Sequence, residues 1–402
     1  MRVLFISGSV GLGHVTRDMA ICSKLRKARP STEVYWMAQE PARSLLEGKG
    51  EHVLEESSEL ANETEIAEET ARGPSLNLIS YQSRTRRNWA RNKEVYRRAT
   101  TRQRYDLVVG DETYDLIYAL NTDRSLKRWP FAMIWDFVGM HSSGGPPDRL
   151  KAYLENLVWS MDGWLGGAED LSIFVGVPED VPDETFGFLL PNMRRYAQRR
   201  YKFVGYILEF NPEDNLDQAE AKRELGYGEK QLIVCSAGGT NIGKELLDKC
   251  VEAYRILEGR LDAEMHIVCG PRIDPRTIDA PDGVKVSGYV KDLYRHFAAS
   301  DLAVVQGGGT TTLELVALQR PFIYFPVEGH FEQERHVSGR LMRMGAGVRL
   351  NHSDTSAEGL AEAIMSNIGR TVHYGEVPCR GAEAASELLA RLMDFRGPET
   401  LG

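Results

Sequence analysis

One local pattern occurs three times in this chain of 402 residues: a short apolar run, a loop with two or more glycines, and a segment of helical spacing. The three copies start near residues 2, 231 and 302. Short apolar runs bounded by turn residues are typical of buried strands, and apolar residues three or four apart are typical of helices. Strands that alternate with helices predict a parallel α/β sheet. Further strands are predicted at residues 33–37, 105–110 and 131–135.

The length and one polar stretch predict two domains. At roughly 150 residues per domain, a chain of this size accommodates two. A proline-containing polar stretch at residues 209–215 marks the boundary, and a new α/β unit starts beyond it. We therefore expect two Rossmann-like domains that face each other across a cleft, residues 1–205 and residues 206–380. A last helical segment is expected within residues 381–402.

Composition excludes several classes of protein. The net charge of -9 argues against a nucleic-acid partner. With no signal-peptide pattern and no apolar run approaching about 18 residues, we expect a soluble, cytoplasmic protein. The five cysteines are odd in number and show no CxxC spacing, so we expect reduced thiols and no metal site. The composition leaves the oligomeric state open.

Two segments of opposite charge lie in the first half. Residues 55–69 are acidic, and residues 84–104 carry nine Arg or Lys beside aromatic residues. The favoured interpretation is that the two segments neutralise each other across a solvated helical surface. The alternative is a basic, aromatic face that holds an anionic acceptor or makes peripheral contact with an anionic membrane.

The first glycine loop carries a candidate base. Gly11 and Gly13 are followed by His14 at the predicted helix start, and the residue three beyond Gly13 is Thr16, so the dinucleotide fingerprint lacks its third glycine. A dinucleotide cofactor is therefore not expected. The helix dipole opposes protonation of His14, and a neutral imidazole is a candidate general base. The alternative is a histidine that only caps or packs the helix.

Three carboxylates follow the ends of predicted strands, where open α/β sheets place their ligands. Asp111, Glu112 and Asp136 are each candidates to orient or balance the histidine. Strand-end carboxylates also cap helices, so that alternative stays open for each. The loop at residues 137–147, with His141, is the candidate for recognising an acceptor.

Residues 306–333 have the chemistry of a nucleotide-diphosphate site. Gly308 and Gly309 lie at a strand-to-helix turn, where glycine permits close approach of a ligand and the helix N-terminus attracts phosphate. Thr310 and Thr311 add hydroxyl donors. Glu314 is about one turn further, where a carboxylate can accept both ribose hydroxyls. The alternative is a glycine-rich turn with a polar cap.

A second glycine loop precedes that site. Gly239 and Thr240 follow the first predicted strand of the second half. Residues 238–244 have the spacing of a P-loop, but Glu245 stands where a Ser or Thr would bind magnesium, so we reject an NTPase.

Taken in order, the motifs of the second half resemble GT-B-fold glycosyltransferases, notably the peptidoglycan N-acetylglucosaminyltransferase group and the UDP-glycosyltransferases. The resemblance covers residues 232–364, with a weaker match over the first forty residues. Its marks are VSGYV at 286–290, ASDL at 299–302, GGGTTTLE at 307–314, RP at 320–321, FP at 325–326 and EQ at 332–333. The EQ pair departs from the plant-type family, in which Asp-Gln is common.

The resemblance implies a role for each matching position. It assigns the nucleobase to the backbone near Tyr289 and Val290, and the hydroxyls of the donor sugar to Glu332 and Gln333. The diphosphate and the ribose go to the glycine–threonine turn and Glu314, as the residues themselves suggested. In the first half, His14 would deprotonate the acceptor, Asp111 would support it, and the last helix would return to the first domain.

The expected reaction is direct displacement at the anomeric carbon, with inversion, from a nucleotide-sugar co-substrate and without a metal. UDP is the favoured nucleotide and TDP the next, and the acceptor is not identified. The GxGHxxR pattern at residues 11–17 also resembles nucleotide-sugar hydrolases of the same fold. The 2-epimerases share this fold too, so a hydrolase and an epimerase are both alternatives. A further alternative is a non-catalytic module that binds a nucleotide sugar.

Overall fold

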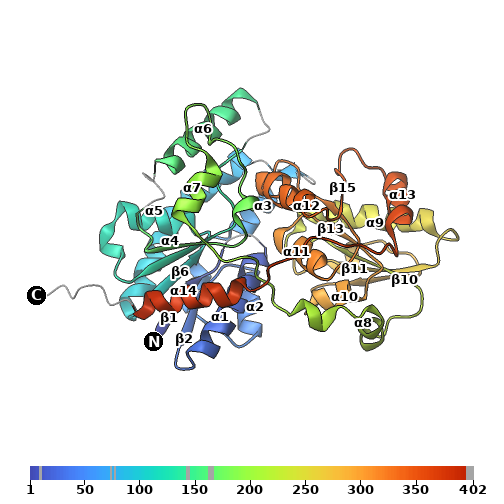
Figure 1. The fold of residues 1–402 in the computed structure, drawn as a ribbon, viewed down its shortest axis with the longest axis horizontal. Coiled ribbons are helices and arrows are strands. Elements are labelled where there is room, and N and C mark those ends of the chain that lie inside the picture. The colour runs from blue at the N-terminus through green and yellow to red at the C-terminus, as the bar shows by residue number, and fades with distance from the viewer. Residues whose placement is uncertain (9–10, 73–74, 77, 142–144, 162–166, 395–402) are drawn as a thin grey trace, which may run out of the picture. The chain divides into compact units, whose positions relative to one another are not determined.

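The computed structural model describes residues 1–8, 11–72, 75–76, 78–141, 145–161 and 167–394. It separates into two compact units, each built on a parallel sheet with helices against it (Figure 1). The first unit comprises Met1–Ile66, Ile79–Glu209 and Pro378–Gly402, and the second comprises Ala67–Leu78 and Phe210–Val377. The predicted class, two parallel α/β domains, is confirmed.

The units are less continuous than the sequence suggested. Residues 67–78 belong to the second unit, although the expected N-terminal domain was one segment, 1–205. The Glu68 carboxylate accepts the Asn241 N–H at 2.9 Å and pairs with Arg272 at 2.5 Å. Such contacts between distant segments leave no periodic signal in a sequence.

In the first unit the strand order is β3-β2-β1-β6-β7-β8-β9, with every pair parallel. The strands are β1 Arg2–Ile6, β2 Glu33–Met37, β3 His52–Val53, β6 Leu107–Asp111, β7 Phe131–Trp135, β8 Leu171–Phe174 and β9 Lys202–Phe203. The helices are α1 Gly13–Ala28, α2 Ala42–Gly48, α3 Glu63–Thr70, α4 Leu78–Arg102, α5 Tyr114–Thr122, α6 Pro146–Ser160, α7 Met193–Arg200 and α14 Gly381–Asp394.

Helices α1 and α14 pack together although they come from opposite ends of the chain (Figure 1). Ile21 and Leu25 of α1 and Leu389 of α14 are fully buried in one core with the sheet. An ion pair joins Lys24 to Glu383. The predicted last helix therefore forms, and residues 395–402 of the expected segment lie outside the described residues.

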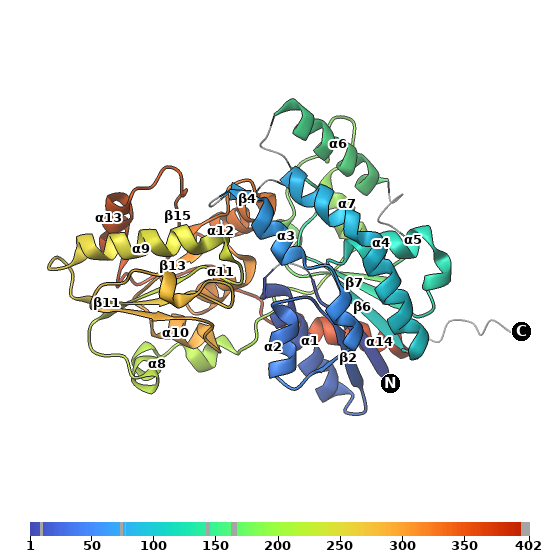
Figure 2. The same cartoon turned by 180° about the vertical axis from the view of Figure 1, so that it is seen from behind.

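In the second unit the order is β12-β11-β10-β13-β14-β15, again all parallel. The strands are β10 Gln231–Ser236, β11 Ala263–Val268, β12 Val284–Ser287, β13 Leu302–Gln306, β14 Phe322–Phe325 and β15 Val348–Arg349. The helices are α8 Gln218–Leu225, α9 Lys244–Leu257, α10 Leu293–Ala299, α11 Gly309–Ala317, α12 Ser338–Arg343 and α13 Ala357–Asn367. The π-helix Glu332–Val337 precedes α12, and the short pair β4 Ala71–Arg72 and β5 Ser75–Leu76 is antiparallel (Figure 2 shows β4).

The charged segments of the first unit face each other. Arg98 of α4 pairs with Glu59 at 2.7 Å, and Arg102 pairs with Glu56 at 2.8 Å. Both carboxylates come from the acidic segment, so the contacts agree with the favoured interpretation of mutual neutralisation. Within the described part of the chain, no helix combines the length and the apolar character that crossing a bilayer requires.

Candidate functional site

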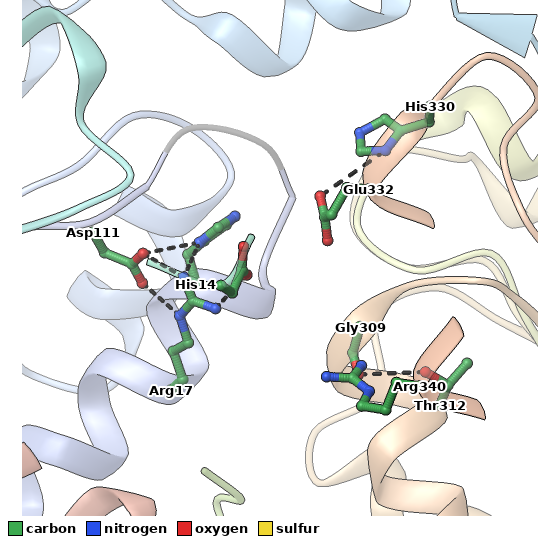
Figure 3. A network of polar contacts seen from close by, with 9 residues as sticks. His14, Arg17, Asp111, Gly309, Thr312, His330, Glu332 and Arg340 are labelled. Atoms are coloured by element: carbon green, nitrogen blue, oxygen red, sulfur yellow. Dashed lines mark hydrogen bonds and ion pairs between the residues drawn. The ribbon is translucent and has the colours of Figure 1, made fainter. Parts of the chain in front are cut away.

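Three neighbouring strands of the first unit bring together the candidate catalytic side chains. Strand β1 pairs with β6, and β6 pairs with β7. His14 lies in the first turn of α1, Asp111 is the last residue of β6, and Asp136 follows β7. Because the carboxyl ends of parallel strands lie at one edge, residues more than 90 positions apart meet there (Figure 3).

Gly8 explains how the histidine reaches this edge. A Cβ atom at Gly8 would lie 2.8 Å from Cγ of His14 and 2.8 Å from the Asp111 carbonyl oxygen. Both distances are too short for a side chain, so the imidazole packs directly on the backbone. The glycine of the predicted loop is thus needed to seat the histidine, while Ser9 and Val10 lie outside the described residues.

Nδ1 of His14 has two neighbours that demand opposite tautomers. It lies 3.2 Å from Oδ1 of Asp111 and 2.9 Å from Nη2 of Arg17. A protonated Nδ1 donates to Asp111 and leaves Nε2 as a base, whereas an unprotonated Nδ1 accepts from the guanidinium, which can only donate. Asp111 therefore favours the basic tautomer and Arg17 opposes it.

Arg17 holds the two carboxylates in place. Its Nε donates to Oδ2 of Asp111 at 2.7 Å, Nη2 bonds to Oδ1 of the same carboxylate, and Nη1 donates to Asp136 at 2.5 Å. Against the effect of burial, Arg17 lowers the pKa of Asp111 to about 2 and holds the pKa of Asp136 well below its usual range. Both groups are therefore charged at neutral pH.

The protonation of His14 differs from the sequence-based expectation. Burial opposes its charge, but Asp111 and, more weakly, Asp136 outweigh burial and Arg17, so the pKa of His14 lies above the ordinary value of 6.5. The helix dipole was expected to keep the ring neutral. Carboxylates in contact act at shorter range than a helix end, which is why they prevail.

The same edge offers a group of potential metal ligands. His14, Glu112 and Asp136 each present a ligand atom, all within 4.8 Å of one another. The guanidinium of Arg17 contacts both His14 and Asp136. A positive charge at that position disfavours a bound cation.

The other candidates of the first unit lie around this cluster. Gly11 has a φ of 76°, which favours glycine, and its N–H is 3.4 Å from the Thr64 hydroxyl. Gly13 begins α1. Glu112 is buried with a φ of 50°, and His141 is exposed in the loop after β7. Among the three candidate carboxylates, Asp111 lies within hydrogen-bond distance of His14, at 3.2 Å.

In the second unit the predicted diphosphate residues form the start of α11. Gly308 is the N-cap, and Gly309, Thr310 and Thr311 are the first turn. The N–H groups of a first turn have no partner within their own helix and suit an anion. A Cβ on Gly308 would meet no atom within 4 Å, so its backbone is open to a ligand.

Side chains from the segment after β14 converge on this helix end. Nη2 of Arg340 donates to the Gly309 carbonyl at 3.0 Å, and a Cβ on Gly309 would lie 3.8 Å from Oε1 of Glu332 (Figure 3). Glu332 in turn lies 3.9 Å from Nδ1 of His330. Glu332 is thus close to the predicted diphosphate residues, as its expected role requires.

Within the second unit, the glycine loop after β10 lies beside the glycine loop after β13, because β10 pairs with β13. A Cβ on Gly238 would be 3.9 Å from Oε1 of Gln306, and a Cβ on Gly270 would be 2.2 Å from the Gly238 carbonyl. The loops after β10 and β11 are therefore in contact, and the β10 loop lies near Gln306, the last residue of β13. Gly239 and Thr240 belong to the first of them, at partly exposed positions.

The remaining donor-site candidates occupy different surroundings. Glu314 is half-buried on α11, and Tyr289 and Val290 follow β12, where Tyr289 is 49% exposed. Gln333 already uses its side-chain oxygen to accept the Val327 N–H at 2.9 Å. That bond holds the loop after β14 and uses one of the two lone pairs of the oxygen, so the amide N–H₂ and the second lone pair of Gln333 remain for a sugar.

Neither Arg17 nor Arg340 was predicted from the sequence as a site residue. Arg17 stands three residues after His14, so both fall on one face of the helix, and that spacing was the available signal. Arg340 had no such signal, because its contact with Gly309 spans 31 positions.

Comparison with known proteins finds similarity to glycosyltransferases. Residues 233–368 match the glycosyltransferase family 28 C-terminal domain. An uncharacterized glycosyltransferase of Methanosarcina acetivorans is 27% identical over 175 residues, 43% of this chain and 42% of that protein. The UDP-N-acetylglucosamine–N-acetylmuramyl-(pentapeptide) pyrophosphoryl-undecaprenol N-acetylglucosamine transferase of Chlamydia muridarum is 26% identical over 155 residues, 36% of this chain and 43% of that protein.

Solved structures show the fold of the whole chain. The spinosyn rhamnosyltransferase SpnG complexed with thymidine diphosphate has a TM-score of 0.57 at 18% identity, covering 98% of this chain and 96% of that one. The GT-B resemblance is confirmed. In sequence, the chain spans less than half the length of the two curated relatives described, at 42% and 43%.

Proposed function

We propose that this chain, which has the GT-B fold and carries a glycosyltransferase family 28 C-terminal domain, transfers a sugar from a nucleotide-diphosphate donor to an acceptor hydroxyl. The observation that carries the proposal is that the matched region contains the first turn of α11, with its glycines and threonines. UDP is the favoured nucleotide because a relative is named for a UDP-sugar, and TDP is next because a structural neighbour is described with thymidine diphosphate.

His14 is the proposed base. The acceptor oxygen attacks the anomeric carbon, its proton passes to Nε2 of His14, and the bond from that carbon to the diphosphate oxygen breaks with its electron pair. Attack opposite the leaving group inverts the configuration. Asp111 would hold the basic tautomer and stabilise the imidazolium that forms.

The leaving group needs positive charge, which the second unit offers without a metal. The first-turn N–H groups of α11 and the helix dipole would receive the diphosphate, and Arg340 fixes the Gly309 carbonyl of that turn. Glu314 would bind the ribose, and Glu332 with the Gln333 amide would bind the sugar. Turnover that survives a metal chelator is the expected result of this arrangement.

The first test is calorimetric titration of UDP, TDP, GDP and ADP into the protein and into Glu314→Ala. We expect UDP or TDP to bind selectively and Glu314→Ala to weaken binding by about 1 to 3 kcal/mol, the size of lost charged hydrogen bonds. The exposed Glu362→Ala on α13 is a matched control that should bind like the wild type. If none of the four nucleotides bound, the donor site and the transferase would both be rejected.

Product analysis separates the enzymatic alternatives. A hydrolase or epimerase would convert the nucleotide sugar without an acceptor, giving free sugar or an epimer. A binding module would give neither, with or without an acceptor. A transferase requires an acceptor for turnover and leaves free nucleotide diphosphate, so nucleotide-sugar consumption with and without an acceptor pool distinguishes the three.

Peripheral contact with an anionic membrane, from a cytoplasmic location, is part of the proposal. Helix α6 and the loop at residues 186–190 expose large apolar side chains, and Tyr153 of α6 donates to the Phe188 carbonyl at 3.2 Å. The exposed residues are Leu150, Leu154, Met161, Phe188 and Leu189. Leu189 is 86% exposed with a φ of 61°, an unfavourable conformation for leucine that presents it outward.

Basic residues flank these apolar side chains. Arg149 and Lys151 lie on α6, and the Arg86–Glu155 pair at 2.5 Å brings the basic start of α4 beside it. We expect co-sedimentation with phosphatidylglycerol vesicles but not with phosphatidylcholine vesicles. Leu189→Ser should reduce it, and Met342→Ser, which changes an 80% exposed methionine of the second unit, should not. Equal binding by both variants would exclude this surface.

A further inference from the structure

A partly buried chain of polar side chains in the second unit lies apart from the residues considered so far. The hydroxyl oxygen of Tyr227 is 2.6 Å from Nδ1 of His266 and 2.6 Å from Nδ1 of His296. Nε2 of His266 is 2.9 Å from the Ser287 hydroxyl oxygen. The tyrosine follows α8, and the other three lie in β11, α10 and β12, so one hydroxyl connects four segments.

The ends of this chain bracket one loop. Ser287 is the last residue of β12 and His296 is in α10, and residues 288–292 run between those elements. That loop contains Tyr289 and Val290, the residues expected at the nucleobase. His266 also lies beside the end of β12, where the loop begins, because it pairs with Lys285 in the parallel register of β11 and β12.

We propose that Tyr227 is a positioning residue for nucleotide binding, which fixes the nucleobase loop at both ends through Ser287 and His296. The inference rests on the proposed function, since it assumes that residues 288–292 receive the base. Tyr289 in this loop is 49% exposed. If the loop were disordered before the nucleotide binds, binding would have to order it, and because ordering each residue costs free energy, the affinity for the nucleotide would be lower.

The hydrogen-bond chain needs at least one imidazole with an unprotonated Nδ1. A phenol carries one proton, so Tyr227 donates to one Nδ1 and accepts from the other. Burial and the Lys285 ammonium lower the pKa of both histidines to about 4, and Arg295 contributes at His296. Lys285 lies 5.9 Å from the centre of the Tyr227 ring, and Glu264 on β11 is the acidic group that acts on the tyrosine. The neutral forms therefore persist at physiological pH.

The test compares two ligands on two tyrosine variants of the full chain. UDP contains the base and inorganic pyrophosphate lacks it, so only UDP depends on the loop. Tyr227→Phe should weaken the affinity for UDP about fivefold, which is the effect of one or two lost hydrogen bonds. Its affinity for pyrophosphate should stay within about twofold of that of the wild type. General destabilisation of the protein would weaken the binding of both ligands, so it would not explain a loss of affinity for UDP alone.

Tyr254→Phe is the matched control. Its hydroxyl is buried and donates to the Ala263 carbonyl of β11 at 3.0 Å, but it lies in the core on α9. We expect both ligands to bind this variant as they bind the wild type. Ser287→Ala, which removes only the end of the chain, should repeat the selective loss of UDP affinity if Tyr227→Phe does not fold.

The binding results test the positioning role of Tyr227 separately from the proposed transferase function. Selective loss of UDP affinity in Tyr227→Phe or Ser287→Ala supports the positioning role. UDP affinity equal to that of Tyr254→Phe in the folded variants overturns it while the donor site stands. Failure of the wild type to bind any of UDP, TDP, GDP and ADP rejects the proposed function itself.

Discussion

Nη2 of Arg17 lies 2.9 Å from Nδ1 of His14, the same nitrogen that faces Asp111 at 3.2 Å. A cation beside the hydrogen-bonding nitrogen of a proposed base is unusual, because it favours the wrong tautomer. It is tolerated here because Arg17 also binds both carboxylates that act on the ring. The arginine thus sets the charge of the site by ordering Asp111 and Asp136.

Replacing Arg17 by lysine should separate geometry from charge. One ammonium cannot make the paired bonds to Asp111 and reach Asp136 as well, so the base loses its fixed partner. We expect kcat to fall by about 10- to 100-fold with the donor KM nearly unchanged, a result typical of lost acid–base positioning. Steady-state kinetics at saturating acceptor would show this, and a rise in donor KM alone would contradict it.

Asp111→Asn should move the pH dependence in a defined direction. His14 acts when deprotonated, so kcat/KM should rise with pH through a pKa above the ordinary 6.5. Without the Asp111 charge that pKa drops, and the acidic limb should shift to lower pH while kcat falls by about 10² to 10⁴. An unmoved limb in the variant would mean that another group is the base.

Two adjacent glycines should respond in opposite ways to alanine. A Cβ at Gly307 would lie 2.9 Å from Cα of Pro326, whereas one at Gly308 would meet nothing within 4 Å. Gly307→Ala should therefore cost about 1 to 3 kcal/mol of stability by overpacking. Gly308→Ala should melt like the wild type but bind UDP more weakly, because the methyl covers the open backbone.

Thermal melts and calorimetry on the Gly307 and Gly308 variants check both halves of that prediction. Gly226→Ala would be a poor control because its φ is 73°, whereas Gly339→Ala on α12 has open space and a helical backbone. Wild-type UDP affinity in Gly308→Ala would exclude the predicted diphosphate position.

The second unit should lose stability in mild acid. His266 and His296 have a folded-state pKa of about 4, below the value of 6.5 expected in the unfolded chain. The unfolded state therefore binds more protons between those values, and stability should fall as pH drops from about 6.5 to about 4. The carboxylates Asp111 and Asp136 do not change the stability in that window, because the stability that their lowered pKa values contribute is lost only below about pH 4.

Hydrogen exchange can assign this loss to its origin. Protection of β11 should decrease between pH 7 and pH 5 after correction for intrinsic exchange, and His266→Gln should flatten the dependence. All six tryptophans lie between residues 36 and 164, so their fluorescence reports the first unit and serves as the internal reference. Constant protection of β11 would contradict the depressed pKa values.

The sequence by itself determined the local elements and the positions of the glycine loops. Strands β2, β7 and β10 begin and end where their apolar runs predicted, because burial on both faces of a parallel sheet requires uninterrupted apolar residues. His14 and the start of α11 were identified for a similar reason, since glycine, a helix start and a polar residue follow one another within a few positions.

Only the tertiary structure decided which distant groups meet. The carboxylate that contacts His14 is 97 positions away, and strand order places Asp111 there rather than Asp136. The raised pKa of His14, the Arg340 contact and the Tyr227 chain also depend on such neighbours. Hydrogen bonds and charges act over a few ångströms in space, and a sequence encodes that proximity only through the fold.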